Sequence, residues 1–125
     1  MRVLVAEDNE FNTMVIKDDL SWYIPDVKIT FVENGKLAVE TYNNFDFDII
    51  LMDVQMPELN GYEATKRIRE IENKNKITRP IPIVAMTASL LKNQIDKCYD
   101  AGMAAYIPKP YKPEDLINTI KSVTQ

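Results

Sequence analysis

The chain contains no histidine, and this absence excludes more functions than any other feature of its composition. It rules out Ser-His-Asp and Cys-His catalysis, histidine-ligated zinc or iron, and phosphohistidine chemistry carried by this chain. The single cysteine, Cys98, rules out an internal disulfide and is typical of a reducing compartment. Any chemistry must therefore be carried by carboxylates, hydroxyls and lysines.

Long apolar runs and an excess of basic residues are also absent. No apolar run approaches the length of a membrane span, and the chain begins directly with a strand-like segment, so we expect a cytoplasmic protein without membrane insertion. Fifteen Lys and Arg face nineteen Asp and Glu, a net charge of −4, which argues against direct nucleic-acid binding. With no repeat or domain boundary visible, residues 1–125 should form a single domain with no output domain attached.

Short apolar runs of four residues predict buried parallel strands. These runs are residues 3–6, 49–52, 83–86 and 104–107. A fifth segment, residues 27–32, alternates apolar and polar positions, which predicts a strand at the edge of a sheet. Segments with helical period follow each strand, so strand and helix alternate five times. This order predicts an α/β fold in which helices cover both faces of a parallel sheet.

The first predicted helix carries apolar side chains at helical spacing. Its apolar positions are Phe11, Met14, Val15, Ile16 and Leu20. We expect this stripe to pack on the sheet. Trp22 and Tyr23, at the end of the same helix, are interpreted as packing residues and not as a ligand platform.

End signals place the other helices. Asn34 is a candidate N-cap for the second, and Pro113 opens the fifth. The fourth helix is expected to begin near Leu90 and to end towards Gly102, a candidate C-cap. The polar stretch of residues 72–79, after the third helix, is interpreted as a loop.

Polar side chains follow the predicted strands where they end. Glu7 and Asp8 follow the first run, Asp53 the second and Thr87 the third, while Lys109 comes just after the last. In an open α/β sheet the carboxyl ends of parallel strands lie at one edge, where ligands bind. We therefore expect three acids, a hydroxyl and a cation to converge there.

This set of groups suits phosphoryl chemistry. Three neighbouring carboxylates repel one another and need a cation, and oxygen ligands favour Mg²⁺. The ion would keep Asp53 ionised as a nucleophile. Lys109 and the Thr87 hydroxyl would bind oxygens of the transferred phosphoryl group. The sequence thus predicts a phosphoacceptor site at Asp53.

Over its whole length the chain closely resembles the receiver domain of two-component response regulators. The signature elements occur in order as 5-VAEDN-9, 51-LMDVQMPELNG-61, 84-VAMTA-88 and 106-YIPKP-110. The spacings from Asp8 to Asp53, Thr87 and Lys109 are 45, 34 and 22 residues in turn, as is typical of receivers. The combination is far more specific than any single motif.

The resemblance implies a flavodoxin-like, doubly wound sheet of strand order 2-1-3-4-5. It implies that Asp53 takes a phosphoryl group from the phosphohistidine of a sensor histidine kinase or a histidine phosphotransfer protein. Residues 51–65 and 102–110 look most like receivers of hybrid sensor kinases or phosphorelays. The Lys109-Pro110 peptide is a candidate cis bond, because receivers are often cis there.

The resemblance also implies a set of ligands for Mg²⁺, with Mn²⁺ or Ca²⁺ as substitutes. Asp8, Asp53 and the backbone carbonyl of Gln55 would hold the ion, and Glu7 would act largely through water. Glu7 departs from the aspartate that is commoner at its position.

Two further pairs of residues receive roles from the resemblance. Thr87 and Tyr106 would form a switch, and Gln55 and Ser89 would tune how quickly the phosphoryl group is lost. The switch would reshape the face of the fourth helix, fifth strand and fifth helix, where a downstream protein target would bind. For Tyr106 a second interpretation stays open, in which the ring simply caps the core.

Three other kinds of protein share parts of this pattern. A haloacid dehalogenase phosphatase needs a second acid two residues after the nucleophile, where this chain has Gln55, and there is no room for a substrate cap. A flavodoxin-like cofactor binder would place phosphate against the acids of residues 7–11. The third, a pseudo-receiver that binds proteins without being phosphorylated, usually lacks a key acid or the lysine, and this chain lacks neither. We do not expect an ordinary enzyme, since a receiver catalyses only its own phosphorylation and dephosphorylation.

Overall fold

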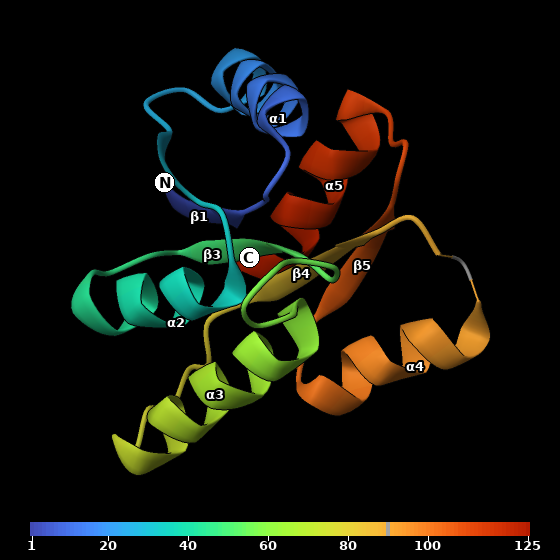
Figure 1. Cartoon of the computed structure of the whole chain (residues 1–125). Helices are drawn as coiled ribbons and strands as arrows, with labels where there is room; N and C mark the ends of the chain where they lie inside the picture. Colours follow the sequence, from blue (N-terminus) through green and yellow to red (C-terminus); the bar gives the residue numbers. More distant parts are fainter. Residues whose placement is uncertain (90) are drawn as a thin grey trace.

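The computed structural model describes residues 1–89 and 91–125, and strands and helices alternate throughout (Figure 1). The strands are β1 (Arg2–Ala6), β2 (Lys28–Val32), β3 (Ile49–Asp53), β4 (Ile83–Thr87) and β5 (Ala105–Pro108). The helices are α1 (Glu10–Tyr23), α2 (Gly35–Asn44), α3 (Gly61–Lys74), α4 (Lys92–Ala101) and α5 (Pro113–Thr124). The strands form one parallel sheet of order β2-β1-β3-β4-β5, so the predicted fold is confirmed.

Helices cover both faces of this sheet, with α1 and α5 on one side and α2, α3 and α4 on the other (Figure 1). Alternate residues of each central strand point to opposite faces. On β1, for example, Val5 packs in the cluster that contains Leu20 of α1, and Leu4 packs in the cluster that contains Ile68 of α3. Each fully buried Leu or Ile contributes about 1.5–3 kcal/mol relative to an exposed position.

Two expectations about exposure were wrong. The last strand was expected to be buried, but it forms the second edge of the sheet, and Tyr106 is only partly buried. This strand also begins at Ala105, one residue later than predicted. On α1, Ile16 and Leu20 are buried, but Phe11 and Met14 are 72% and 63% exposed. A helix lying on a sheet buries only about one face, and the sequence offered more apolar positions than that face could use.

The helix ends follow the predicted signals with one exception. Asn34 accepts a hydrogen bond from the backbone of α2, Pro113 opens α5, and Gly102 ends α4 at φ 106°, in the left-handed region that favours glycine. Leu90, the expected start of the fourth helix, lies outside the described residues, and α4 begins at Lys92. The exception is the predicted loop of residues 72–79, because α3 continues through its first three residues.

Glu72 explains that exception. Its carboxylate is 3% exposed and accepts hydrogen bonds from Ile81 N at 2.7 Å and the Tyr42 hydroxyl at 3.2 Å. Arg69, one turn earlier, forms an ion pair with Glu72 at 2.6 Å and also donates to the Gly102 carbonyl oxygen. The buried carboxylate therefore joins α2, α3, the segment before β4 and, through Arg69, the end of α4.

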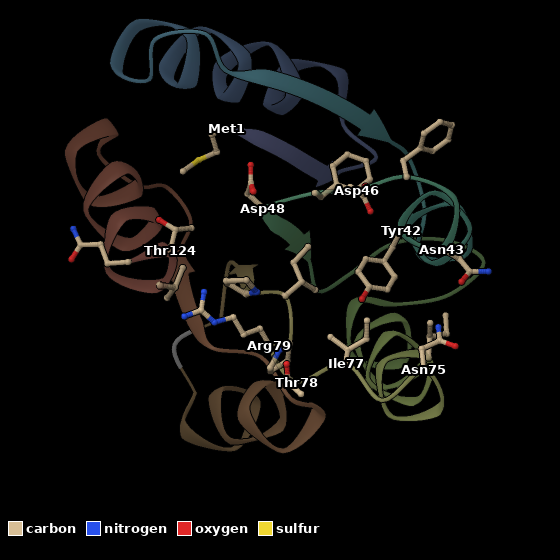
Figure 2. A pocket seen from close by; sticks show the side chains of 18 residues that line it. Met1, Tyr42, Asn43, Asp46, Asp48, Asn75, Ile77, Thr78, Arg79 and Thr124 are labelled. Carbon is tan, nitrogen blue, oxygen red and sulfur yellow. The ribbon is translucent and has the colours of Figure 1, made fainter.

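The amino ends of the strands border a cavity of about 910 Å³ (Figure 2). Asp48 and Arg79 lie around it, and both ends of the chain, Met1 and Gln125, line it. Because Met1 and Gln125 line this cavity, both chain termini lie at the amino ends of the strands. A strand of five residues spans roughly 15 Å, and this length separates the termini from the carboxyl edge of the sheet.

Candidate functional site

The carboxyl ends of β1 and β3 bring three acids together. Asp53 is the last residue of β3, and Glu7 and Asp8 follow the last residue of β1. One carboxylate oxygen from each acid lies within 4.8 Å of the others. Glu7 and Asp53 are 3% and 8% exposed, whereas Asp8 faces solvent. The predicted convergence of the acids is thus present in the structure.

Lys109 joins this cluster from the end of β5. Its ammonium lies 2.8 Å from Glu7 Oε2 and 3.3 Å from Asp53 Oδ2. Its backbone N–H donates to the Thr87 carbonyl oxygen at 2.8 Å, which fixes the turn after β5 to the end of β4. The peptide bond to Pro110 is cis, as expected.

Burial dominates the electrostatics of Asp53. It raises the pKa of Asp53 to about 6, the positive charge of Lys109 opposes that rise, and the negative charge of Glu7 adds to it. For Lys109, burial lowers the pKa, but the hydrogen bond that it donates to Glu7 and the negative charge of Asp53 outweigh this effect, so the net direction is upward. One ammonium therefore faces more negative charge than it can balance.

The donor set fits a hard divalent cation. Among the described residues, Glu7, Asp8 and Asp53 form the cluster that could hold a metal ion, and all three offer carboxylate oxygens. Oxygen ligands without nitrogen or sulfur favour a hard cation. Burial and the negative charge of Glu7 raise the pKa of Asp53, and the positive charge of a bound ion would oppose that rise. Mg²⁺ suits such a site because it accepts two or three carboxylates and retains water.

The loop after β3 holds Asp53 in place. Gln55 N donates to Asp53 Oδ1 at 3.2 Å, and Gly61 N donates to the Val54 carbonyl oxygen at 2.9 Å. Gly61 is required here because a Cβ at this position would collide with the carbonyl oxygen of Asp53. The loop thus brings the Gln55 backbone next to the cluster, and ligation by its carbonyl stays a prediction.

The two residues expected to form a switch lie on neighbouring strands. Thr87 is 7% exposed, and its hydroxyl oxygen accepts a hydrogen bond from Ser89 N at 3.1 Å. Tyr106 is partly buried and packs edge-to-face on Tyr99 of α4, with ring centroids 6.4 Å apart. The switch role of Thr87 and Tyr106 stays a prediction, and the position of Tyr106 suits both a switch and a ring that caps the core.

The sequence motifs did not identify Asn12, which lies in the first turn of α1. Its side-chain Nδ2 donates to Glu7 Oε1 at 3.2 Å, and Asn9 N donates to the same oxygen at 3.2 Å. Asn9 also caps the helix by accepting from Asn12 N at 3.1 Å. The available signal was a second asparagine three residues after the cap, a spacing that aims its side chain back towards the end of β1.

An exposed apolar face on α1 was also missed. Trp22 is 82% exposed, so its interpretation as a packing residue was wrong. Together with Phe11, Met14 and Val15 it forms what we call the α1 face, and positions 11, 14, 15 and 22 fall on one side of a helix. Phe11 lies in the turn that follows the acidic pair, so this face begins beside the site.

Comparison with known proteins assigns the chain to a family. The profile of the response regulator receiver domain matches residues 3–121. The chain belongs to this family. Hybrid signal transduction histidine kinase B of Dictyostelium discoideum is 39% identical over 93% of this chain, and histidine kinase 3 of Arabidopsis thaliana is 32% identical over 95%. The receiver spans only 6% and 13% of the lengths of these two relatives.

Solved receiver domains share both the fold and part of the sequence. The receiver of the Saccharomyces cerevisiae response regulator Ssk1, in complex with the histidine phosphotransfer protein Ypd1, has a TM-score of 0.92 and 30% identity, with 99% of this chain and 88% of that chain covered. The receiver of the sensor histidine kinase PA1611 from Pseudomonas aeruginosa has a TM-score of 0.85 and 35% identity, with 98% and 96% covered. That receiver carries a magnesium ion in its active-site cleft. None of the helices described in the present chain combines the length and apolar character needed to cross a bilayer.

Proposed function

We propose that this receiver domain accepts a phosphoryl group on Asp53 in a Mg²⁺-dependent reaction and thereby switches a surface for a protein partner. The observation that carries the proposal is the position of Asp53 at a buried strand end, 3.3 Å from Lys109 and beside two further acids. A carboxylate oxygen of Asp53 attacks phosphorus, the bond from phosphorus to the donor nitrogen breaks, and an acyl phosphate forms. The phosphohistidine that donates the group lies outside these 125 residues, because they contain no histidine.

Each neighbour of Asp53 has a part in this reaction. Asp8 and Asp53 would hold the ion directly, together with the Gln55 carbonyl, while Glu7 would act through water. The ion supplies positive charge to the transferred oxygens when it is bound. Lys109 binds a further phosphoryl oxygen, since its ammonium already lies against Asp53. The domain remains a phosphoacceptor rather than an ordinary enzyme, because it turns over only its own phosphoryl group.

The switch is proposed to start at Thr87. Phosphorylation adds about −1.5 to −2 charge and three acceptor oxygens at Asp53. The Thr87 hydroxyl, now held by Ser89 N, would turn to donate to one of these oxygens. Tyr106 would then move relative to α4 and change the face of α4, β5 and α5, where a downstream protein binds. Gln55 and Ser89 would tune the lifetime of the phosphoryl group.

The phosphodonor is proposed to be a histidine kinase or a histidine phosphotransfer protein in the cytoplasm. The yeast receiver that resembles this chain forms a complex with a histidine phosphotransfer protein. The α1 face gives this chain an exposed apolar surface beside the site, which a donor protein could cover while its histidine reaches Asp53. Excision from a longer hybrid kinase would fit the relatives that it matches.

Intact mass after incubation with a small-molecule phosphodonor tests the proposal directly. We expect a gain of one phosphoryl group with Mg²⁺, no gain without it, and no gain for Asp53→Asn. Asp46→Asn is the matched control, because this exposed acid lies at the opposite end of the sheet. A folded wild-type chain that gains no mass and binds no Mg²⁺ would instead be a pseudo-receiver that acts by binding proteins.

A further inference from the structure

The two oxygens of the Glu7 carboxylate are held by different parts of the chain. Oε2 accepts from Lys109 Nζ at 2.8 Å. Oε1 accepts from Asn9 N and from Asn12 Nδ2, both at 3.2 Å. Because Glu7 is 3% exposed, these donors set its orientation. The first turn of α1 thus fixes one oxygen, and the lysine at the end of β5 fixes the other.

This arrangement limits what Glu7 can do for a cation. Oε1 already accepts two hydrogen bonds, so direct ligation of an ion by this oxygen would displace at least one of them, and hydrogen bonds to a charged group are costly to lose. Of the two donors to Oε1, only that of Asn12 can be removed by mutation, because Asn9 donates from its backbone and Asn12 donates from its side chain. Its backbone N–H is separately bound to Asn9 Oδ1 at 3.1 Å, so the helix start does not depend on the Asn12 amide group.

We propose that Asn12 is a positioning residue of the phosphoacceptor site. By holding Glu7 Oε1, it keeps Glu7 turned towards Lys109 and leaves direct ligation of the cation to Asp8 and Asp53. The inference rests on the proposed metal site and adds the residue that decides whether a third carboxylate joins the ion. Two direct carboxylates and retained water suit Mg²⁺, whereas a third would favour Ca²⁺, which takes more oxygen ligands.

The test is calorimetric titration of the whole chain with Mg²⁺ and with Ca²⁺. Asn12→Ala frees Glu7 to join the ion, so we expect Ca²⁺ affinity to rise about tenfold, the factor equivalent to one hydrogen bond to a charged group, with a smaller rise for Mg²⁺. Alanine is the best helix former, so this variant should fold, and thermal unfolding checks that it does. Thr13→Ala is the matched control, because its hydroxyl donates to the Glu10 carbonyl within the same turn.

A double-mutant cycle separates positioning from a general structural effect. If Asn12 acts through Glu7, Asn12→Ala should leave the ratio of Ca²⁺ to Mg²⁺ affinity unchanged in a Glu7→Gln background. The ammonium signal of Lys109 in nitrogen NMR gives an independent readout. It should broaden in the ion-bound Asn12→Ala variant, where Glu7 no longer holds the lysine, and remain sharp in Thr13→Ala.

Three results would overturn the inference. They are an unchanged affinity ratio in Asn12→Ala, an equal loss of affinity for both ions, and a shift that persists in the Glu7→Gln background. Failure of the proposed function looks different, because the wild-type chain itself would then bind neither ion. Wild-type binding with an indifferent Asn12→Ala variant rejects only the role of Asn12.

Discussion

Replacing Asp53 with asparagine should stabilise the domain in the absence of metal, although it removes the residue at the centre of the site. Burial raises the pKa of Asp53 to about 6, above its ordinary value of 3.8. Between these two pH values the folded chain binds more protons than the unfolded chain, so stability is lost as the pH rises. The two values correspond to a small cost near pH 4 that grows to about 3 kcal/mol at pH 7. Asparagine has nearly the same shape and carries no charge, so it escapes this cost.

Urea unfolding in a chelator, at several pH values from about 4 to 7, measures the effect. Lys109 keeps its ion pair with Glu7 at 2.8 Å in the variant, so little stability is lost there. The advantage of Asp53→Asn should grow across this range, whereas Asp46→Asn should show no such growth. Added Mg²⁺ should reverse the order, because it binds the folded wild-type chain. A variant that is less stable than wild type at pH 7, or a difference independent of pH, would refute the reasoning.

Three further changes have effects that the structure predicts. Glu72→Gln should lower the free energy of unfolding by about 3 kcal/mol in urea titrations, because it breaks a buried ion pair and turns the amide NH2 group towards another donor, either Arg69 or Ile81 N. A loss below about 1 kcal/mol would contradict this. Trp22→Ala should change the free energy of unfolding by no more than about 0.5 kcal/mol, because this side chain is 82% exposed. Acrylamide should readily quench the tryptophan fluorescence of the wild-type chain, since Trp22 is its single tryptophan. Gly61→Ala should abolish phosphorylation measured by intact mass, because its Cβ would displace the backbone of Asp53; normal phosphorylation would show that the loop tolerates the methyl group.

The sheet and the core of the site could be predicted because their signals are local. An apolar run such as residues 49–52 has no polar face, so only a strand buried on both sides suits it. The position of Asp53 directly after that run, and of Lys109 after the last one, then follows from the geometry of a parallel sheet. No long-range contact had to be known, because all parallel strands end at the same edge.

The residues that sequence reasoning misplaced depend on long-range contacts. Glu72 is a polar residue just after the last apolar position of the predicted third helix. Nothing in the neighbouring sequence shows that Tyr42 and Ile81 will donate hydrogen bonds to its carboxylate. Trp22 has a large apolar side chain of the kind that is usually found in a core. Only the packing of α1 on the sheet shows that this side chain is exposed to solvent. Periodicity identifies an apolar face, but it does not say which of two apolar faces a neighbour will cover.

The position of Met1 and Gln125 on one cavity makes the domain suitable for insertion into a longer polypeptide. Because both ends of the chain line one cavity at the amino ends of the strands, a host polypeptide could enter and leave the domain at the same end of the sheet. The insertion would leave the acidic edge open to a visiting protein. The same geometry permits circular permutation, in which a short bridge joins the old ends and a new opening is cut in an exposed turn.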